Sequence, residues 1–234
     1  MIPIPLTDHI RRRSFWTATL LLIILNVLCF LFEISLGRGV NRLVFLYGVV
    51  PIRYTQPHAL ARIGPQFTIG SIFISMFLHG GWLHLLGNML FLFVFGRSIE
   101  DRYGHLKFLA IYFLSGFGAW TAHILLNPGS RTPTIGASGA IAGVLGAYCV
   151  SYPAARITTL IPLFFFFWRI EVPALLLLGY WFLIQFFAGF QMLAIQTATG
   201  GVAWWAHVGG FLVGMVLALT LPLARRGPVA EIVR

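Results

Sequence analysis

Four polar side chains lie near the starts of apolar segments, and their types suit acyl transfer. They are His84, Asn88, Ser138 and His207. A serine hydroxyl is a weak nucleophile until a base takes its proton, and a histidine suits that role near neutral pH. The oxyanion formed in such a reaction needs donors placed in advance, which His84, Asn88 and the Ser138 backbone N–H could supply. This chemistry requires elements that bring the four side chains together.

The elements available are apolar segments of membrane-spanning length. Of the 234 residues, 59% are hydrophobic and 9% are charged, whereas a soluble domain carries roughly 25% charged residues. A membrane helix needs about 20 apolar residues. Six segments approach this length: residues 15–36, 81–97, 106–126, 136–152, 172–190 and 203–224. The sequence predicts an all-α polytopic membrane protein, with six transmembrane helices in one membrane-embedded domain, residues 1–234.

The basic residues predict the orientation of these helices. If the N-terminus is cytoplasmic, the cytoplasmic side holds Arg11, Arg12, Arg13, Arg97, Arg102, Lys107, Arg156, Arg169, Arg225, Arg226 and Arg234, and the outer side holds Arg38, Arg42, Arg53, Arg62 and Arg131. Because cytoplasmic loops are enriched in Lys and Arg, residues 1–14 and 225–234 are expected in the cytoplasm. The net charge of +10 then reflects topology and contact with anionic lipid, and nucleic acid is not an expected partner.

Three apolar stretches are too short or too interrupted to span the bilayer. Residues 43–51 and 67–78 border or fall within the long first loop, and they are expected to lie in the interface or to dip partway into the membrane. Residues 161–170 are expected to form an interfacial lead-in to the fifth helix.

In this orientation the second, fourth and sixth helices all begin at the outer face. The four polar side chains therefore fall in one layer, on the order of 10 Å deep at a rise of about 1.5 Å per residue. His84 and Asn88 share a helix face because they are four residues apart. A water-accessible polar cavity, open to the outer face, is expected around this layer.

Small residues predict which helices pair. Gly139 and Gly143 follow Ser138, and Gly210 and Gly214 repeat the same spacing in the sixth segment. Faces of this kind let two helix backbones approach closely. The fourth helix is therefore expected to pack against the sixth, which carries His207 toward Ser138.

The acidic residues favour a Ser–His dyad over a triad. They are Asp8, Glu33, Glu100, Asp101, Glu171 and Glu231, and of these only Glu33 lies toward the outer end of a span, without a reason to face His207. A zinc site of His79, His84 and His207 is disfavoured, because no acidic or cysteine ligand joins them and the spacing is not that of a metal motif. No metal or cofactor is expected.

Taken together, these motifs resemble the rhomboid family of intramembrane serine proteases. The matching stretches are MFLHGGWLHLLGN from residue 76, TIGASGAIAG from residue 134, WWAHVGGFLVG from residue 204, and GRSIEDRYG, residues 96–104. They occur in the family's order over nearly the whole chain. The resemblance implies a rhomboid-like bundle that needs no cofactor and cleaves membrane-anchored proteins in or near their transmembrane segment.

The resemblance also implies roles for single residues. Ser138 corresponds to the nucleophile and His207 to its base, while His84 and Asn88 correspond to the oxyanion-stabilising residues. Glu100 corresponds to a structural acid near the inner end of the second helix, with Arg97, three residues earlier, as a candidate partner. The chain departs from the family at Ala142, where many members have an aromatic residue that packs on the catalytic histidine.

Other interpretations remain beside the protease. His79 is expected to hold the first loop against the second helix, and the aromatic residues of the fifth helix, Trp181, Phe182, Phe186 and Phe187, are expected to face lipid or pack at the interface. The same chain could be a catalytically inactive rhomboid-like protein that binds membrane proteins, or a transporter, which would favour charged residues in mid-span. The lack of a transit peptide favours a bacterial plasma membrane. The sequence does not indicate an oligomeric state.

Overall fold

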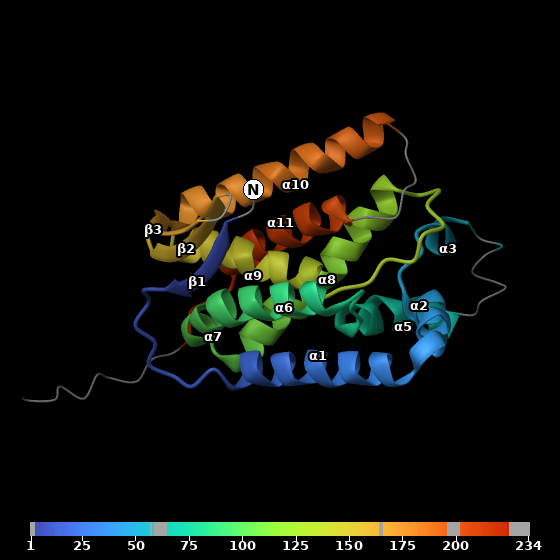
Figure 1. The fold of residues 1–234 in the computed structure, drawn as a ribbon, viewed down its shortest axis with the longest axis horizontal. Coiled ribbons are helices and arrows are strands. Elements are labelled where there is room, and N and C mark those ends of the chain that lie inside the picture. The colour runs from blue at the N-terminus through green and yellow to red at the C-terminus, as the bar shows by residue number, and fades with distance from the viewer. Residues whose placement is uncertain (1–2, 57, 59–64, 164–165, 196–201, 225–234) are drawn as a thin grey trace, which may run out of the picture.

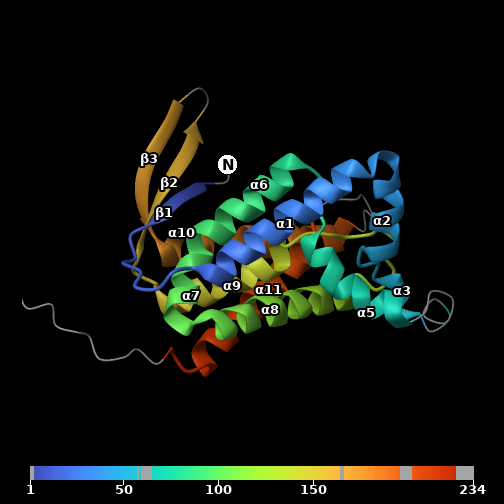
Figure 2. The same ribbon diagram turned by 90° about the horizontal axis from the view of Figure 1, so that it is seen from below.

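The computed structural model describes residues 3–56, 58, 65–163, 166–195 and 202–224. Its longer helices lie roughly along one direction, with a small sheet at one end and the short helices α2, α3 and α5 at the other (Figures 1 and 2). Arg62 and the expected cytoplasmic segment 225–234 lie outside the described residues. The helices are α1 (Thr17–Ser35), η1 (Gly37–Gly39), α2 (Val40–Tyr47), α3 (Ile52–Thr55), α5 (Pro65–Ile74), η2 (Ser75–Phe77), α6 (Trp82–Phe91), η3 (Leu92–Gly96), α7 (Arg97–Tyr103), α8 (His105–Leu126), α9 (Ser138–Ser151), α10 (Ala174–Ile195) and α11 (Trp204–Thr220).

Among the residues that the structure describes, four helical stretches are long and apolar enough to cross a membrane. They are α1, the continuous α6–η3–α7 stretch, α8 and α10. The expected fourth and sixth helices, α9 and α11, are shorter, at 14 and 17 residues. At about 1.5 Å per residue neither reaches the roughly 30 Å of a hydrocarbon core. All six expected helices are present in a mostly helical chain, and the protein is a polytopic membrane protein.

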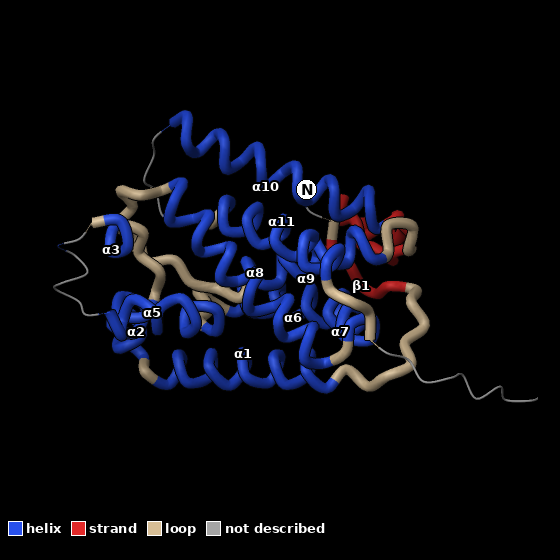
Figure 3. The backbone as a smooth tube through the Cα atoms, turned by 180° about the vertical axis from the view of Figure 1, so that it is seen from behind, coloured by secondary structure: helices blue, strands red, loops and turns tan. Residues whose placement is uncertain are grey.

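Helix α9 is the centre of the bundle and packs against α11, as the small-residue spacing predicts (Figure 3). Every residue from Gly139 to Cys149 is buried. A Cβ at Gly210 would overlap the carbonyl oxygen of Gly139, and a Cβ at Gly214 would overlap that of Gly143. Since the two backbones touch, only glycine fits at these positions, and the short distance between the helices follows from the glycine spacing.

A buried acid from another helix holds the start of α1. Glu100 accepts hydrogen bonds from the backbone N–H groups of Ala18 and Thr19, both at 2.7 Å, and from Thr19 Oγ1 at 2.6 Å. The first N–H groups of a helix have no partner within it, and the indole of Trp16, which precedes α1, cannot accept a hydrogen bond. Glu100 therefore caps α1 across the bundle.

The expected pairing of Arg97 with Glu100 is wrong. Arg97 Nε donates to the carbonyl oxygen of Phe93 at 2.5 Å, and its guanidinium lies 3.7 Å from the centre of the Phe93 ring. Glu100 is instead 2.5 Å from His105 Nδ1. The three-residue spacing would allow the side chains of Arg97 and Glu100 to touch. The Glu100 carboxylate instead accepts hydrogen bonds from the backbone N–H groups at the start of α1.

A three-stranded antiparallel sheet lies where an interfacial lead-in was expected. Its strands, in the order β1-β2-β3, are β1 (Ile4–Asp8), β2 (Arg156–Leu163) and β3 (Phe166–Pro173). The described residues of this stretch, 161–163 and 166–170, thus belong to the paired strands β2 and β3, and β3 leads directly into α10. This sheet was not predicted from the sequence, because its first strand comes from the N-terminal segment, which was expected to be a cytoplasmic tail.

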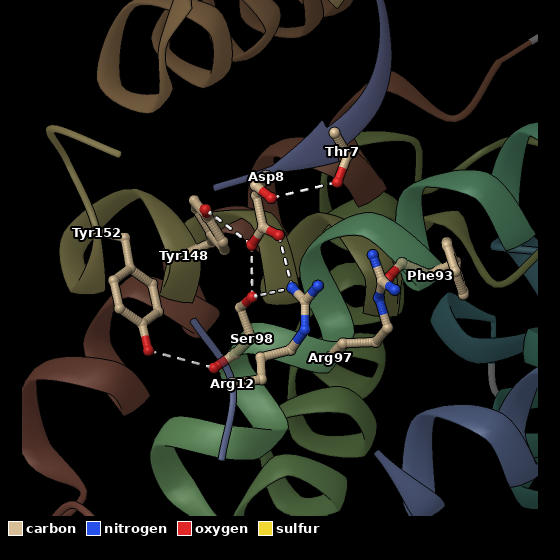
Figure 4. Close-up of polar contacts among 8 residues, drawn as sticks. All are labelled: Thr7, Asp8, Arg12, Phe93, Arg97, Ser98, Tyr148 and Tyr152. Carbon is tan, nitrogen blue, oxygen red and sulfur yellow. Dashed lines mark hydrogen bonds and ion pairs between the residues drawn. The ribbon is translucent and has the colours of Figure 1, made fainter. Parts of the chain in front are cut away.

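The N-terminal strand is fixed to the bundle by a buried polar network around Asp8 (Figure 4). The Asp8 carboxylate accepts hydrogen bonds from Arg12 Nη1 at 2.6 Å, from Tyr148 OH at 3.1 Å and from Ser98 Oγ. These partners come from the chain just after β1, from α9 and from α7. One carboxylate therefore joins the sheet to the centre of the helix bundle.

Candidate active site

Ser138 and His207 meet at the contact between α9 and α11. Ser138 Oγ lies 2.8 Å from His207 Nε2, and the histidine is 8% exposed. Ser138 is the first residue of α9, and His207 lies in the first turn of α11. A serine hydroxyl within hydrogen-bond reach of a histidine is the geometry that base-assisted nucleophilic attack requires.

Gly136 gives the chain its approach to α9. Its φ of +132° is a conformation that favours glycine, and a Cβ there would lie 2.8 Å from Cε1 of His84. Its N–H donates to the carbonyl oxygen of Ser75 at 2.8 Å. The loop before Ser138 is thereby held against His84, so Ser138 and His84 face the same space.

Two histidines near the start of α6 have tautomers defined by their partners. Gly80 N–H points to His84 Nδ1 at 3.4 Å, which leaves the proton of His84 on Nε2. His79 Nδ1 lies 3.2 Å from the carbonyl oxygen of Phe77, and its Nε2 lies 3.0 Å from Asn88 Nδ2. His79 thus donates through Nδ1 and accepts from Asn88 through Nε2. Burial, with a smaller effect of His84, lowers the pKa of His79 to about 4, so this ring is neutral near pH 7.

Glu33 links α1 to the same region. Its carboxylate accepts the backbone N–H of His79, with its two oxygens 3.0 and 3.3 Å away, and it is 2% exposed. Glu33 thus holds His79, and His79 holds Asn88. Glu33 therefore accepts a hydrogen bond from the backbone of the first loop, whereas the partner of His207 Nδ1 is Gln185.

One cavity contains the side chains that the sequence singled out. It has a volume of about 820 Å³ and is lined by residues of α6, α8, α9, α10, α11 and the segments before α9 and α11. Its polar lining includes His84, Asn88, Ser138 and His207. The remaining lining is largely apolar, from Leu83 on α6 to Trp181 on α10, so an extended apolar chain segment fits its chemistry.

Two residues of α10 contact His207, and neither contact was predicted from the sequence. Gln185 Oε1 lies 2.6 Å from His207 Nδ1, and the Trp181 ring centre lies 5.8 Å from that of His207. Trp181 was expected to face lipid or pack at the interface; it instead packs on His207 and lines the cavity, as Ala142 does. Phe182 likewise packs on Phe211 of α11. The available signal was Gln185 itself, the one amide in the expected fifth span, since polar groups within membranes face protein partners or water.

The fold and site are those of a membrane-embedded protein with a Ser–His pair inside a helix bundle. The rhomboid domain family matches residues 66–223, which is more than half of the chain. The protein therefore belongs to the rhomboid family.

The chain is similar to several named rhomboid proteins. It is 32% identical over 151 residues to RHOMBOID-like protein 6, mitochondrial, of Arabidopsis thaliana, covering 63% of this chain and 42% of the relative. It is 31% identical over 159 residues to the rhomboid protease AarA of Providencia stuartii, covering 62% and 53%. It is 32% identical over 187 residues to rhomboid protein 1, mitochondrial, of Saccharomyces cerevisiae, covering 76% and 50%.

These alignments span about half of each relative's length. Two of the three relatives are named as mitochondrial, so the expectation of a bacterial plasma membrane is not supported by them. The protein is an integral membrane protein of a family with intramembrane protease function.

Proposed function

We propose that the protein is an intramembrane serine endopeptidase, with Ser138 as nucleophile and His207 as general base. The observation that carries the proposal is the 2.8 Å contact between Ser138 Oγ and His207 Nε2, made inside a cavity that His84 and Asn88 also line. Similarity to a relative named as a rhomboid protease supports it. No metal or cofactor takes part in the proposed reaction.

The reaction follows from these groups. As Ser138 Oγ attacks the carbonyl carbon of a peptide bond, His207 Nε2 accepts the hydroxyl proton. Negative charge moves to the carbonyl oxygen, toward His84 Nε2–H and the second N–H of the Asn88 amide, whose first N–H is held by His79. His207 then gives its proton to the leaving nitrogen, the C–N bond breaks, and an ester remains on Ser138.

Water completes the cycle. His207 takes a proton from a water molecule, whose oxygen attacks the ester carbon, and it returns the proton to Ser138 Oγ as the ester bond breaks. The water must reach a site inside the bundle, so the cavity also serves as its path. Glycines at the α9–α11 contact, Gly139, Gly143, Gly210 and Gly214, support the site by setting the distance between the nucleophile and its base.

The proposed substrates are proteins anchored in the membrane by a helix. A helix hides its carbonyl groups in hydrogen bonds, so the segment to be cut must unwind before Ser138 can reach it. Substrates with Gly, Pro or other helix-weakening residues near the membrane boundary are therefore expected. The largely apolar lining of the cavity suits such a segment.

We propose that both termini are cytoplasmic and that the site opens toward the outer face. Among the described basic residues, the N-terminal arginines and Arg156 and Arg169 of the sheet fall at the sheet end (Figure 2). Ser138 starts α9 at the opposite end of that helix from β2. Because cytoplasmic loops are enriched in Lys and Arg, the sheet end is assigned to the cytoplasm.

Cleavage of a transmembrane reporter by the purified full chain in detergent tests the proposed function. The parent is expected to cut, and Ser138→Ala and His207→Ala are each expected to lose at least about 1,000-fold in rate, since the pair acts as a unit. Ser35→Ala, an exposed serine of α1, is the matched control and should cut like the parent.

Two results would overturn the assignment. Cleavage that persists in Ser138→Ala would mean that another residue is the nucleophile. A parent that neither cleaves nor reacts with a serine-directed fluorophosphonate would favour the alternative function, an inactive rhomboid-like protein that binds membrane proteins.

A further inference from the structure

We infer that Gln185 is the positioning residue of the base, a neutral third member of the site that acts on His207 from α10. The inference rests on the proposed function and adds a residue to it. Its direct support is the 2.6 Å contact between Gln185 Oε1 and His207 Nδ1, with Gln185 only 4% exposed.

The two hydrogen bonds of His207 require one proton arrangement. For Nε2 to accept the proton of Ser138 Oγ, the neutral ring must carry its own proton on Nδ1. The partner of Nδ1 must then be an acceptor, and Gln185 presents its carbonyl oxygen there. In the opposite tautomer Nε2 would carry the proton and could not act as base. Gln185 thus selects the tautomer and the ring orientation that the reaction needs.

The membrane setting explains an amide in place of a carboxylate. A carboxylate beside the base would stabilise the protonated ring more strongly, but a buried charge inside a membrane protein is costly. An amide accepts the Nδ1–H bond without that cost. No catalytic acid was expected from the sequence, and the partner that orients His207 is accordingly an uncharged amide.

The orienting contact depends on the packing of α10 against α11. Trp181, Gln185 and Gly189 are spaced four residues apart on the face of α10 that meets α11. Trp181 packs on the His207 ring, and a Cβ at Gly189 would lie 3.1 Å from the Trp205 ring. The base is held in its reactive tautomer only while this face of α10 rests on α11.

Substitution by methionine tests the inference, because it keeps the length of the side chain and removes its acceptor. In the reporter assay, Gln185→Met is expected to lower kcat about 10- to 100-fold with little change in KM, as part of the general-base contribution is lost. Gln185→Glu, which still presents an acceptor oxygen to Nδ1, should keep more of kcat than Gln185→Met. Gln191→Met, an exposed glutamine of the same helix, is the matched control and should match the parent.

A spectroscopic readout separates this inference from the proposed function. With ¹⁵N-labelled histidine, the His207 signal, identified by its loss in His207→Ala, should show a proton on Nδ1 in the parent and in Gln191→Met. It should show a tautomer mixture in Gln185→Met. An unchanged tautomer in Gln185→Met, or a kcat equal to that of the parent, would overturn the role of Gln185. If the parent never cleaves the reporter, the proposed function is refuted but the role of Gln185 is still tested, because the ¹⁵N spectrum reports the His207 tautomer without any cleavage.

Discussion

His207 makes contacts on both nitrogens and on its ring face, and these contacts come from two other helices, α9 and α10. Ser138 at the start of α9 meets Nε2, Gln185 of α10 meets Nδ1, and Trp181 packs on the ring. The aromatic packing that Ala142 does not provide thus comes from α10. At the scale of residues, the site is a set of hydrogen-bonded rings and amides whose proton positions follow from their neighbours.

Asn88 offers a direct test of oxyanion stabilisation. Its amide is oriented by His79 and lines the cavity beside Ser138. Asn88→Ala is expected to lower kcat about 100- to 1,000-fold while KM changes little, because the lost donor acts mainly on the charge of the transition state. Asn41→Ala, an exposed asparagine of α2, is the control. Steady-state cleavage of the reporter measures both, and an unchanged kcat in Asn88→Ala would exclude the role.

At the scale of elements, the contact between α9 and α11 sets the distance between Ser138 and His207. The two helices touch backbone to backbone through glycines. Hydrophobic burial drives helix association weakly within lipid, where packing at close range contributes much of the stability. The glycines therefore stabilise the bundle and align the site at the same time.

Gly210→Ala tests this contact. The added methyl group would overlap the Gly139 carbonyl oxygen, so the helices must separate, at a cost of about 1–3 kcal/mol. We expect a lower midpoint of thermal unfolding in detergent together with reduced cleavage. Gly179→Ala is the matched control, since a Cβ there meets nothing within 4 Å, and it should be neutral or slightly stabilising. Equal midpoints for the two variants would contradict close packing at Gly210.

At the scale of the whole molecule, buried acids join parts of the chain that are far apart in sequence. Glu100 caps α1, Glu33 holds the first loop through His79, and Asp8 ties the sheet to α7 and α9. Each places carboxyl oxygens where backbone or side-chain donors would otherwise be buried without partners. These three acids are thus part of the architecture of the fold.

Asp8→Ala is expected to destabilise the fold by about 1–3 kcal/mol, because the hydroxyl groups of Ser98 and Tyr148 lose a buried acceptor and Arg12 loses its carboxylate. Glu171→Ala is the matched control: its carboxylate is 48% exposed, lies 3.5 and 3.9 Å from His9 and Arg156, and should matter little. Thermal unfolding of both variants measures the difference, and a larger loss in Glu171→Ala would refute the anchoring role of Asp8.

The sequence by itself determined the membrane class, the six helices and the set of side chains that gather at Ser138. These depend on local features: the length of apolar runs, the spacing of glycines and the position of polar residues within each helix. Ala142 also indicated, from the sequence alone, that another side chain must pack on His207. The same features showed that α9 and α11 pair, since each presents its glycines on one face.

Only the tertiary structure decided which side chains complete those helices. The acceptor for His207 Nδ1 is 22 residues away on α10, the cap of α1 comes from Glu100, and β1 pairs with a strand that begins at Arg156. Such contacts join elements far apart in the chain, and their geometry depends on how whole helices are placed against one another. The spacing of residues within one segment does not determine that placement. For this reason the sequence predicted an Arg97–Glu100 pair that does not form, and it did not predict the contact of Gln185 with His207.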